Sequence, residues 1–203
     1  MTRPALLDTL ARDLAASGYD LRRLARGVVM SRAYSRSSKY NSSPPDGNLF
    51  AVAKLKPLTP LQLATSLKIA AADPASLEGE PEEVEKKLEQ LESSARGLAA
   101  LLAQPTDNFQ IGVAEALLFS NGERIVKEYL TDNAGSALGR VQTMTDPRQA
   151  VKFLVKSAYG RAATEEESRA LTAYVDRRKG REPEAYRQVL WALVTAPEFR
   201  FCY

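Results

Sequence analysis

Apolar residues recur at helical spacing near the N-terminus. Two groups, spaced three or four residues apart, each mark one face of a helix: Leu6, Leu10 and Leu14, then Leu21, Leu24 and Val28. Gly18 can end the first helix, since glycine tolerates the left-handed turn that follows a helix, and Asp20 can cap the second by accepting hydrogen bonds from free amides. The pattern predicts a helical hairpin in which the apolar line of the second helix is buried.

Three later helix starts share one device, a capping side chain placed three residues before a Glu or Gln. These pairs are Thr59 with Gln62, Asp146 with Gln149, and Thr164 with Glu167. Pro60 and Pro147 stand at the first helical position, where the missing proline N–H costs nothing. We therefore predict helices that begin directly after residues 59, 146 and 164.

Residues 81–104 carry the longest periodic pattern. Their apolar positions alternate in steps of four and three: Val84, Leu88, Leu91, Ala95, Leu98 and Leu102. This heptad-like line predicts a long helix, but it is shorter than the three to four sustained heptads typical of a coiled coil. We favour a helix packed on its own domain, and an intermolecular coiled coil stays as the alternative.

The rest of the chain also favours helices. Residues 111–119 and 125–130 predict two short helices, and a looser glycine-containing segment follows to residue 145. No stretch shows the alternation of a half-buried strand. We predict an all-α fold, an irregular helical bundle of about seven or eight helices, in one domain over residues 1–203 with a polar loop at 35–48.

The last helix is strongly apolar and ends in Ala-Pro-Glu-Phe. Pro197 cannot continue the helix, so the chain turns there and Phe199 can fold back onto the bundle. We interpret Trp191 as a buried core anchor. A ligand site at these three residues is the less favoured alternative.

Composition excludes several kinds of chemistry. The 203 residues contain no histidine and one cysteine, Cys202, which excludes zinc fingers, iron–sulfur clusters and Ser-His-Asp or Cys-His catalysis. The carboxylates at 82–83 and 165–167 lie in first helical turns, where the helix dipole explains them. We expect no metal, no cofactor and no catalytic residue, and we favour a protein that is not itself an enzyme.

Arginines give the main candidate for ligand binding. The chain has a net charge of +3. If the second helix continues at 100° per residue, four of its arginines fall within an arc of about 120°: Arg22, Arg26, Arg32 and Arg36. Lys39 and Tyr40 follow in the polar loop. Such a stripe can hold a glycan, a nucleic acid or an acidic protein surface. We favour the alternative, a solvated face whose arginines cover the core.

Five ordered segments resemble one family, the planctomycete domain of unknown function 1553, a PSD1-type C-terminal domain. They lie at residues 6–38, 50–63, 115–122, 159–167 and 186–203. Lys56, Gln62 and Ala163 replace an arginine, an acid and a proline of the family pattern. The family's Asn-Arg-x-Trp helix and Phe-Gly-x-Gly-Leu-Val segment do not occur, so the chain resembles an N-terminally shortened module.

The resemblance implies an extracytoplasmic home, because such modules follow a signal peptide and a cytochrome c-like module in large surface or periplasmic proteins. Asp8, Arg12 and Asp13 interrupt the apolar stretch that a signal peptide needs, and no apolar run approaches the roughly 20 residues of a membrane span. We expect a non-catalytic binding or scaffolding module for protein domains of the same assembly. The alternatives are an anion-binding module, for a glycan rather than nucleic acid, and an accessory part of an enzyme whose catalytic domain lies elsewhere.

Overall fold

The computed structural model describes residues 5–38, 40, 43, 49, 51–53, 55–105, 113–121 and 123–202. Contacts divide the chain into two compact units, of which the first extends to Lys56 and the second runs from Pro57 to Cys202. The single domain expected from the sequence stays a prediction. Within the predicted polar loop at 35–48, no described residue lies in a helix or strand.

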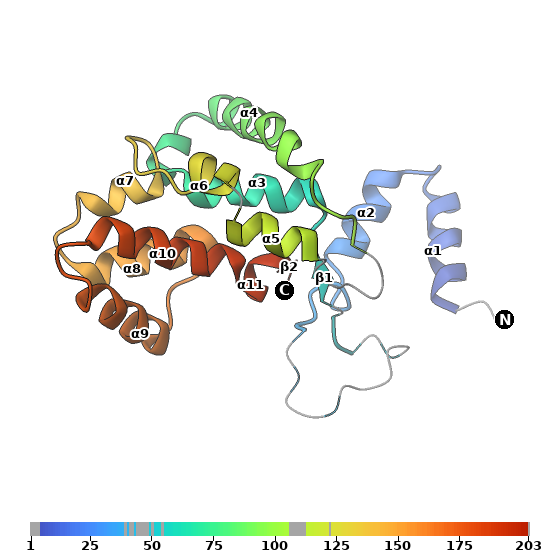
Figure 1. Cartoon of the computed structure of the whole chain (residues 1–203). Coiled ribbons are helices and arrows are strands. Elements are labelled where there is room, and N and C mark those ends of the chain that lie inside the picture. The colour runs from blue at the N-terminus through green and yellow to red at the C-terminus, as the bar shows by residue number, and fades with distance from the viewer. Residues whose placement is uncertain are drawn as a thin grey trace. The chain divides into compact units, whose positions relative to one another are not determined.

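The described residues form eleven α-helices, one short 3-10 helix and two two-residue strands, which confirms the all-α fold (Figure 1). The helices are α1 (Ala5–Ala16), α2 (Leu21–Val29), α3 (Pro60–Ala71), α4 (Pro81–Ala99), α5 (Val113–Asn121), α6 (Glu123–Tyr129), α7 (Ala137–Gln142), α8 (Pro147–Tyr159), α9 (Glu165–Asp176), α10 (Glu182–Thr195) and α11 (Pro197–Arg200). The 3-10 helix is η2 (Pro74–Leu77), and the strands are β1 (Lys56–Pro57) and β2 (Phe201–Cys202).

The first unit contains the predicted helical hairpin. Gly18 has a φ of +70° between α1 and α2, and the Asp20 carboxylate accepts the backbone N–H groups of Arg22 and Arg23. The two helices contact each other, and Arg23 pairs with Asp13 at 2.8 Å. The prediction of a buried apolar line on α2 is wrong, because Leu21 is 68% exposed and no residue of α2 is buried. Two helices alone offer too little surface to cover both apolar faces.

The second unit begins with an antiparallel pair, α3 and α4, which lie side by side and run in opposite directions (Figure 1). Thr59 and Gln62 form the predicted capping box at the start of α3. η2 fills the turn between the two helices, and α8 packs on the other side of α3. These contacts hold α3 at the centre of the unit.

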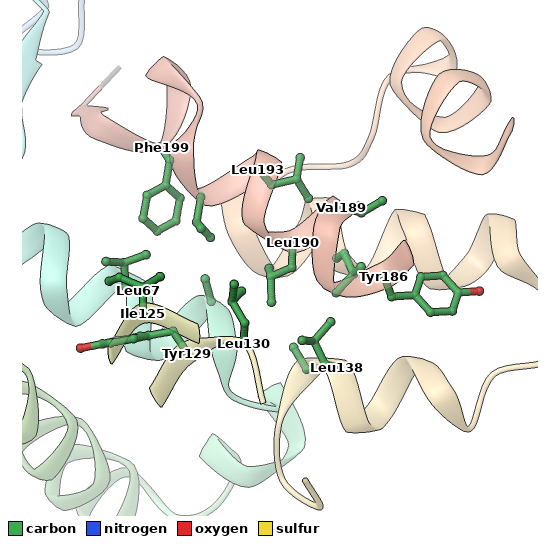
Figure 2. Close-up of a cluster of buried hydrophobic side chains, with 14 of the residues drawn as sticks. Leu67, Ile125, Tyr129, Leu130, Leu138, Tyr186, Val189, Leu190, Leu193 and Phe199 are labelled. Atoms are coloured by element: carbon green, nitrogen blue, oxygen red, sulfur yellow. The ribbon is translucent and has the colours of Figure 1, made fainter. Parts of the chain in front are cut away.

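The core of this unit lies between α3, α6, α7, α8 and α10 (Figure 2). Residues from well-separated segments meet there: Leu67, Ile125, Tyr129, Leu130, Leu138, Tyr186, Val189, Leu190, Leu193 and Phe199. The predicted caps Asp146 and Thr164 are both present, at the starts of α8 and α9. Cooperative burial of the apolar core side chains is the main force that stabilises the unit.

The segment predicted as loose before residue 145 contains a helix, α7, so that prediction is wrong. Ser136 caps α7, and its Oγ accepts the N–H of Gly139 at 2.9 Å. A Cβ on Gly139 would stand 2.2 Å from the carbonyl oxygen of Asn133. The glycine therefore reflects a close backbone approach, and α7 and α11 account for part of the difference from the seven or eight helices expected.

Candidate functional site

An open groove lies between α3 and α4 of the second unit. Its volume is about 620 Å³. Apolar and acidic residues line it together with one threonine: Thr65, Ile69, Pro81, Val84, Glu85, Leu88, Glu89 and Glu92. An apolar floor of this kind is typical of a binding surface rather than of a folded core.

The groove exists because the heptad-like line of α4 is covered along only half of its length. Ala95 and Leu98 are completely buried against the rest of the unit. Val84 is half-buried, and Leu88 keeps 39% of its surface exposed, beside Ile69 at 37%. The helix predicted over 81–104 ends at Ala99. It packs on its own unit along its C-terminal half, while the N-terminal half leaves its apolar residues open.

The rim of the groove is acidic. Glu85, Glu89 and Glu92 each follow an apolar position of the α4 line by one residue, so they stand beside that line. None of their side chains forms an ion pair with another residue in the described ranges. The groove thus combines an apolar floor with carboxylates that form no ion pair within the described residues.

The arginines of the predicted stripe do not share one helix face. Arg22 and Arg26 lie on α2 and are exposed, but α2 ends at Val29. Arg32 lies in the turn beyond it, and Arg36 lies in the irregular segment that follows. The chain leaves the helix there because Ser31 donates both its N–H and its Oγ–H to the Val28 carbonyl. The 100° geometry of the prediction therefore fails after residue 29, and Lys39 lies outside the described residues.

A smaller set of arginines does gather on α2. A hollow of about 590 Å³ on this helix is lined by Asp20, Arg22, Arg23, Arg26, Gly27 and Met30. Arg23 is held by Asp13, whereas no ion pair of Arg22 or Arg26 occurs among the described residues. The first unit therefore presents a small basic surface.

The closing segment departs from its prediction at one residue. α10 ends at Thr195, and Pro197 starts α11 after the extended residue Ala196, so the predicted turn is confirmed. Phe199 is buried, as predicted. Trp191 is not a buried anchor, because 37% of its surface is exposed and its indole N–H donates to the Phe119 carbonyl at 3.0 Å. The polar edge of its ring is satisfied at the surface of the bundle.

Charged side chains in this region form two separate ion-paired clusters. Arg161 donates to Glu167 and to Glu198 at 2.6 to 2.9 Å. These hydrogen bonds lower the pKa of Glu167 to about 2 and raise the pKa of Arg161 above its ordinary range. Arg200 and Glu115 form a second pair, which is almost entirely buried and lies against the Phe119 ring. Such pairing explains these charges structurally.

Comparison with known families gives one result. A family model described as PSD1, protein of unknown function (DUF1553), matches residues 1–108. The chain belongs to this family. The matched range contains α1 to α4, and therefore the groove of this DUF1553 chain and the arginines of α2. Of the five segments that suggested the resemblance, 6–38 and 50–63 lie inside the range and the other three lie beyond it.

No curated protein and no solved structure matches the DUF1553 chain. In the ranges that the structure describes, no three His, Cys, Asp or Glu residues come close enough together to hold a metal ion. No described helix is both long and apolar enough to cross a bilayer.

Sequence reasoning missed the groove of this DUF1553 chain, although a signal for it exists. The acidic residues Glu85, Glu89 and Glu92 recur beside the apolar line of α4, as polar residues do beside the seam of a helix that receives a partner. Spacing alone does not identify the basic helix that would pack against this seam. Only the position of α3 shows which apolar residues stay open.

Proposed function

We propose that this DUF1553 chain is a non-catalytic binding module that accepts an amphipathic, basic helix of a protein partner in the groove between α3 and α4. The observation that carries the proposal is the half-covered apolar line of α4, where Val84 and Leu88 remain open between acidic side chains. Helix-in-groove recognition uses such a floor for apolar anchors spaced three or four residues apart.

The chemistry of the rim selects the charge of the partner. Glu85 and Glu89 lie one helical turn apart, about 6 Å along the axis. Basic side chains flanking the apolar anchors of a bound helix can reach both carboxylates. Long-range electrostatic attraction then increases the association rate, and binding is stronger at low ionic strength because salt screens the charges less.

A synthetic helical peptide tests the proposal. A peptide of about 14 residues carries Leu at positions i, i+3 and i+7 and Lys elsewhere, and a control peptide has Glu in place of each Lys. We expect the basic peptide to perturb the NMR signals of Ile69 and Leu88, with an affinity that falls as salt rises from about 0.05 to 0.5 M. Equal binding of both peptides, or perturbation elsewhere only, contradicts the proposal.

Matched variants locate the site. Glu85→Gln with Glu89→Gln should weaken binding of the basic peptide at least about tenfold, since two close charges are removed. Glu165→Gln with Glu166→Gln removes two charges from α9, outside the groove, and should leave the affinity within about twofold. An equal effect of both double variants would mean that only net charge matters.

The basic hollow of α2 supports a second candidate, an anion-binding module. Arg22 and Arg26 line that hollow together, and a glycan with sulfate or carboxylate groups offers matching charge. Heparin retention at about 0.1 M salt, lost in Arg22→Gln with Arg26→Gln, would favour this function. A wild-type protein that does not bind heparin under those conditions would rule out the anion-binding function.

The cellular context stays a proposal. An extracytoplasmic assembly, in which the module scaffolds other protein domains or assists a separate catalytic domain, is supported by the resemblance to PSD1-type modules of surface and periplasmic proteins. A fusion reporter that is active only outside the cytoplasm tests the location. Reporter activity confined to the cytoplasm would contradict it.

A further inference from the structure

We propose that the helix which binds in the α3–α4 groove is α2 of a second copy of the same chain. This inference rests on the proposed function and names its partner. The groove needs a short amphipathic helix with exposed apolar anchors and basic flanks, and α2 has each of these properties.

The charge of the chain is divided unequally. Residues 1–56 contain ten Lys and Arg against four Asp and Glu, whereas residues 57–203 contain 18 against 21. The first unit therefore carries a formal charge of +6 and the remainder −3. Two copies attract each other when the first unit of one approaches the second unit of the other.

The apolar face of α2 supplies the anchors. Leu21, Leu24 and Val28 stand at positions i, i+3 and i+7, the spacing of a helix that lies in a groove. Leu21 is 68% exposed and Val28 is 39% exposed. Exposed apolar side chains in a regular line lose unfavourable contact with water when a partner covers them.

The charged flanks match in spacing. Arg22 and Arg26 are four residues apart on α2, and Glu85 and Glu89 are four residues apart on α4. Each pair therefore spans about 6 Å along its helix, so both arginines can meet both carboxylates in one register. These four side chains make no ion pair with other residues in the part of the chain that the structure describes.

The lengths also agree. α2 has nine residues and so does the stretch of α4 from Val84 to Glu92, so each extends about 13 Å. Each copy contributes one helix and one groove, so two reciprocal contacts can close a dimer. Doubling the contact increases the buried area beyond that of a single helix in a groove.

Charge exchange between two variants tests the inference in the full-length chain. The groove variant carries Glu85→Lys and Glu89→Lys, and the helix variant carries Arg22→Glu and Arg26→Glu. Wild type should show a mass that rises with concentration between about 1 and 200 µM in sedimentation velocity. Each variant alone should lose association, with a dissociation constant raised at least about tenfold, because like charges then face each other.

A mixture of the two variants should associate again, because basic groove then meets acidic helix and the unchanged pair meets as in wild type. The variant with all four substitutions should associate by itself. Control substitutions at exposed sites outside both surfaces, Glu166→Lys with Asp176→Lys and Arg177→Glu with Lys179→Glu, should leave association within about twofold. Circular dichroism and thermal melting establish that every variant is folded.

Several outcomes would overturn the inference. These are a wild type that stays monomeric at the highest concentration, reversed variants that associate as wild type does, and a mixture that fails to form a mixed species. The proposed function has its own test: a chain that binds the basic peptide in its groove but never self-associates keeps the groove as a binding site and rejects α2 as its occupant. A chain that does neither rejects both.

Discussion

Arg161 lies against Glu198, and its Nε donates to Oε1 of that carboxylate at 2.6 Å across 37 residues of sequence. The same guanidinium holds Glu167, which closes the capping box at the start of α9. One arginine therefore ties the end of α8, the start of α9 and the closing turn at α11 together. The planar fork of arginine can serve two carboxylates in this way, whereas lysine cannot.

This arrangement predicts a specific dependence of stability on pH. The pKa of Glu167 is lowered to about 2 by hydrogen bonds from Arg161, from an ordinary 4.5. A depressed pKa means that the contribution is complete above pH 4.5 and is lost as pH falls toward 2. Glu167→Gln keeps a capping-box acceptor but removes the charge. We expect the variant to be less stable than wild type at pH 7, with the difference shrinking between pH 4.5 and 2.

Urea unfolding at a series of pH values measures this difference. Glu166→Gln is the matched control, since Glu166 is exposed and takes part in no ion pair with any described residue. Its free energy of unfolding should differ from that of wild type by less than about 0.5 kcal/mol at every pH. A constant deficit of Glu167→Gln across the range would show that the carboxylate charge is not the cause.

Substitutions at the buried pair of Arg200 and Glu115 should have strongly non-additive effects on the free energy of unfolding. Arg200 is 5% exposed, so Glu115→Gln leaves its charge without a matching anion and should cost about 3 to 5 kcal/mol. The double variant Glu115→Leu with Arg200→Met removes both charges and should recover most of that loss. Chemical denaturation of the three proteins gives the coupling energy, and a double variant as unstable as the single one would contradict the prediction.

Gly139 should resist substitution because of its contact with the backbone at Asn133. A Cβ there would lie 2.2 Å from a carbonyl oxygen, so α7 must move in Gly139→Ala, and we expect a loss of about 2 kcal/mol or more. Gly27 is the matched control, since it is helical and has no atom within 4 Å of its added Cβ. Gly27→Ala should be neutral or stabilising by up to about 1 kcal/mol. Thermal melting separates the two, and equal effects would contradict the steric explanation.

Truncation of Phe199 should destabilise the protein more than truncation of the larger Trp191. Phe199 is buried, so Phe199→Ala should cost about 3 to 5 kcal/mol, while Phe199→Leu keeps most of the volume and should cost about 1. Trp191→Ala should cost less than Phe199→Ala, because the indole is partly exposed and makes one hydrogen bond. At about 2 to 4 °C per kcal/mol for a chain of this size, melting temperatures resolve the order. The reverse order would restore Trp191 as the main anchor.

The prediction for Trp191 shows where periodicity stops being informative. α10, the last long helix, is strongly apolar as the sequence indicated, and it buries a stripe that includes Val189 and Leu190. Trp191 follows Leu190 by 100° around the helix, on the edge of that stripe. Spacing alone does not tell whether an edge position is covered, because the answer depends on how closely the neighbouring helix approaches. Here the indole reaches the carbonyl of Phe119 instead of entering the core.

By itself, the sequence determined the all-α fold and the first residues of its capped helices. The caps at Thr59 and Thr164 involve hydrogen bonds across three residues, so their formation needs no distant partner. Only the tertiary structure decided which half of α4 is covered and that Arg161 meets Glu198. These features depend on helix crossing and on contacts between segments far apart in the chain. A periodic pattern records which face of a helix is apolar, but it does not record what lies opposite that face.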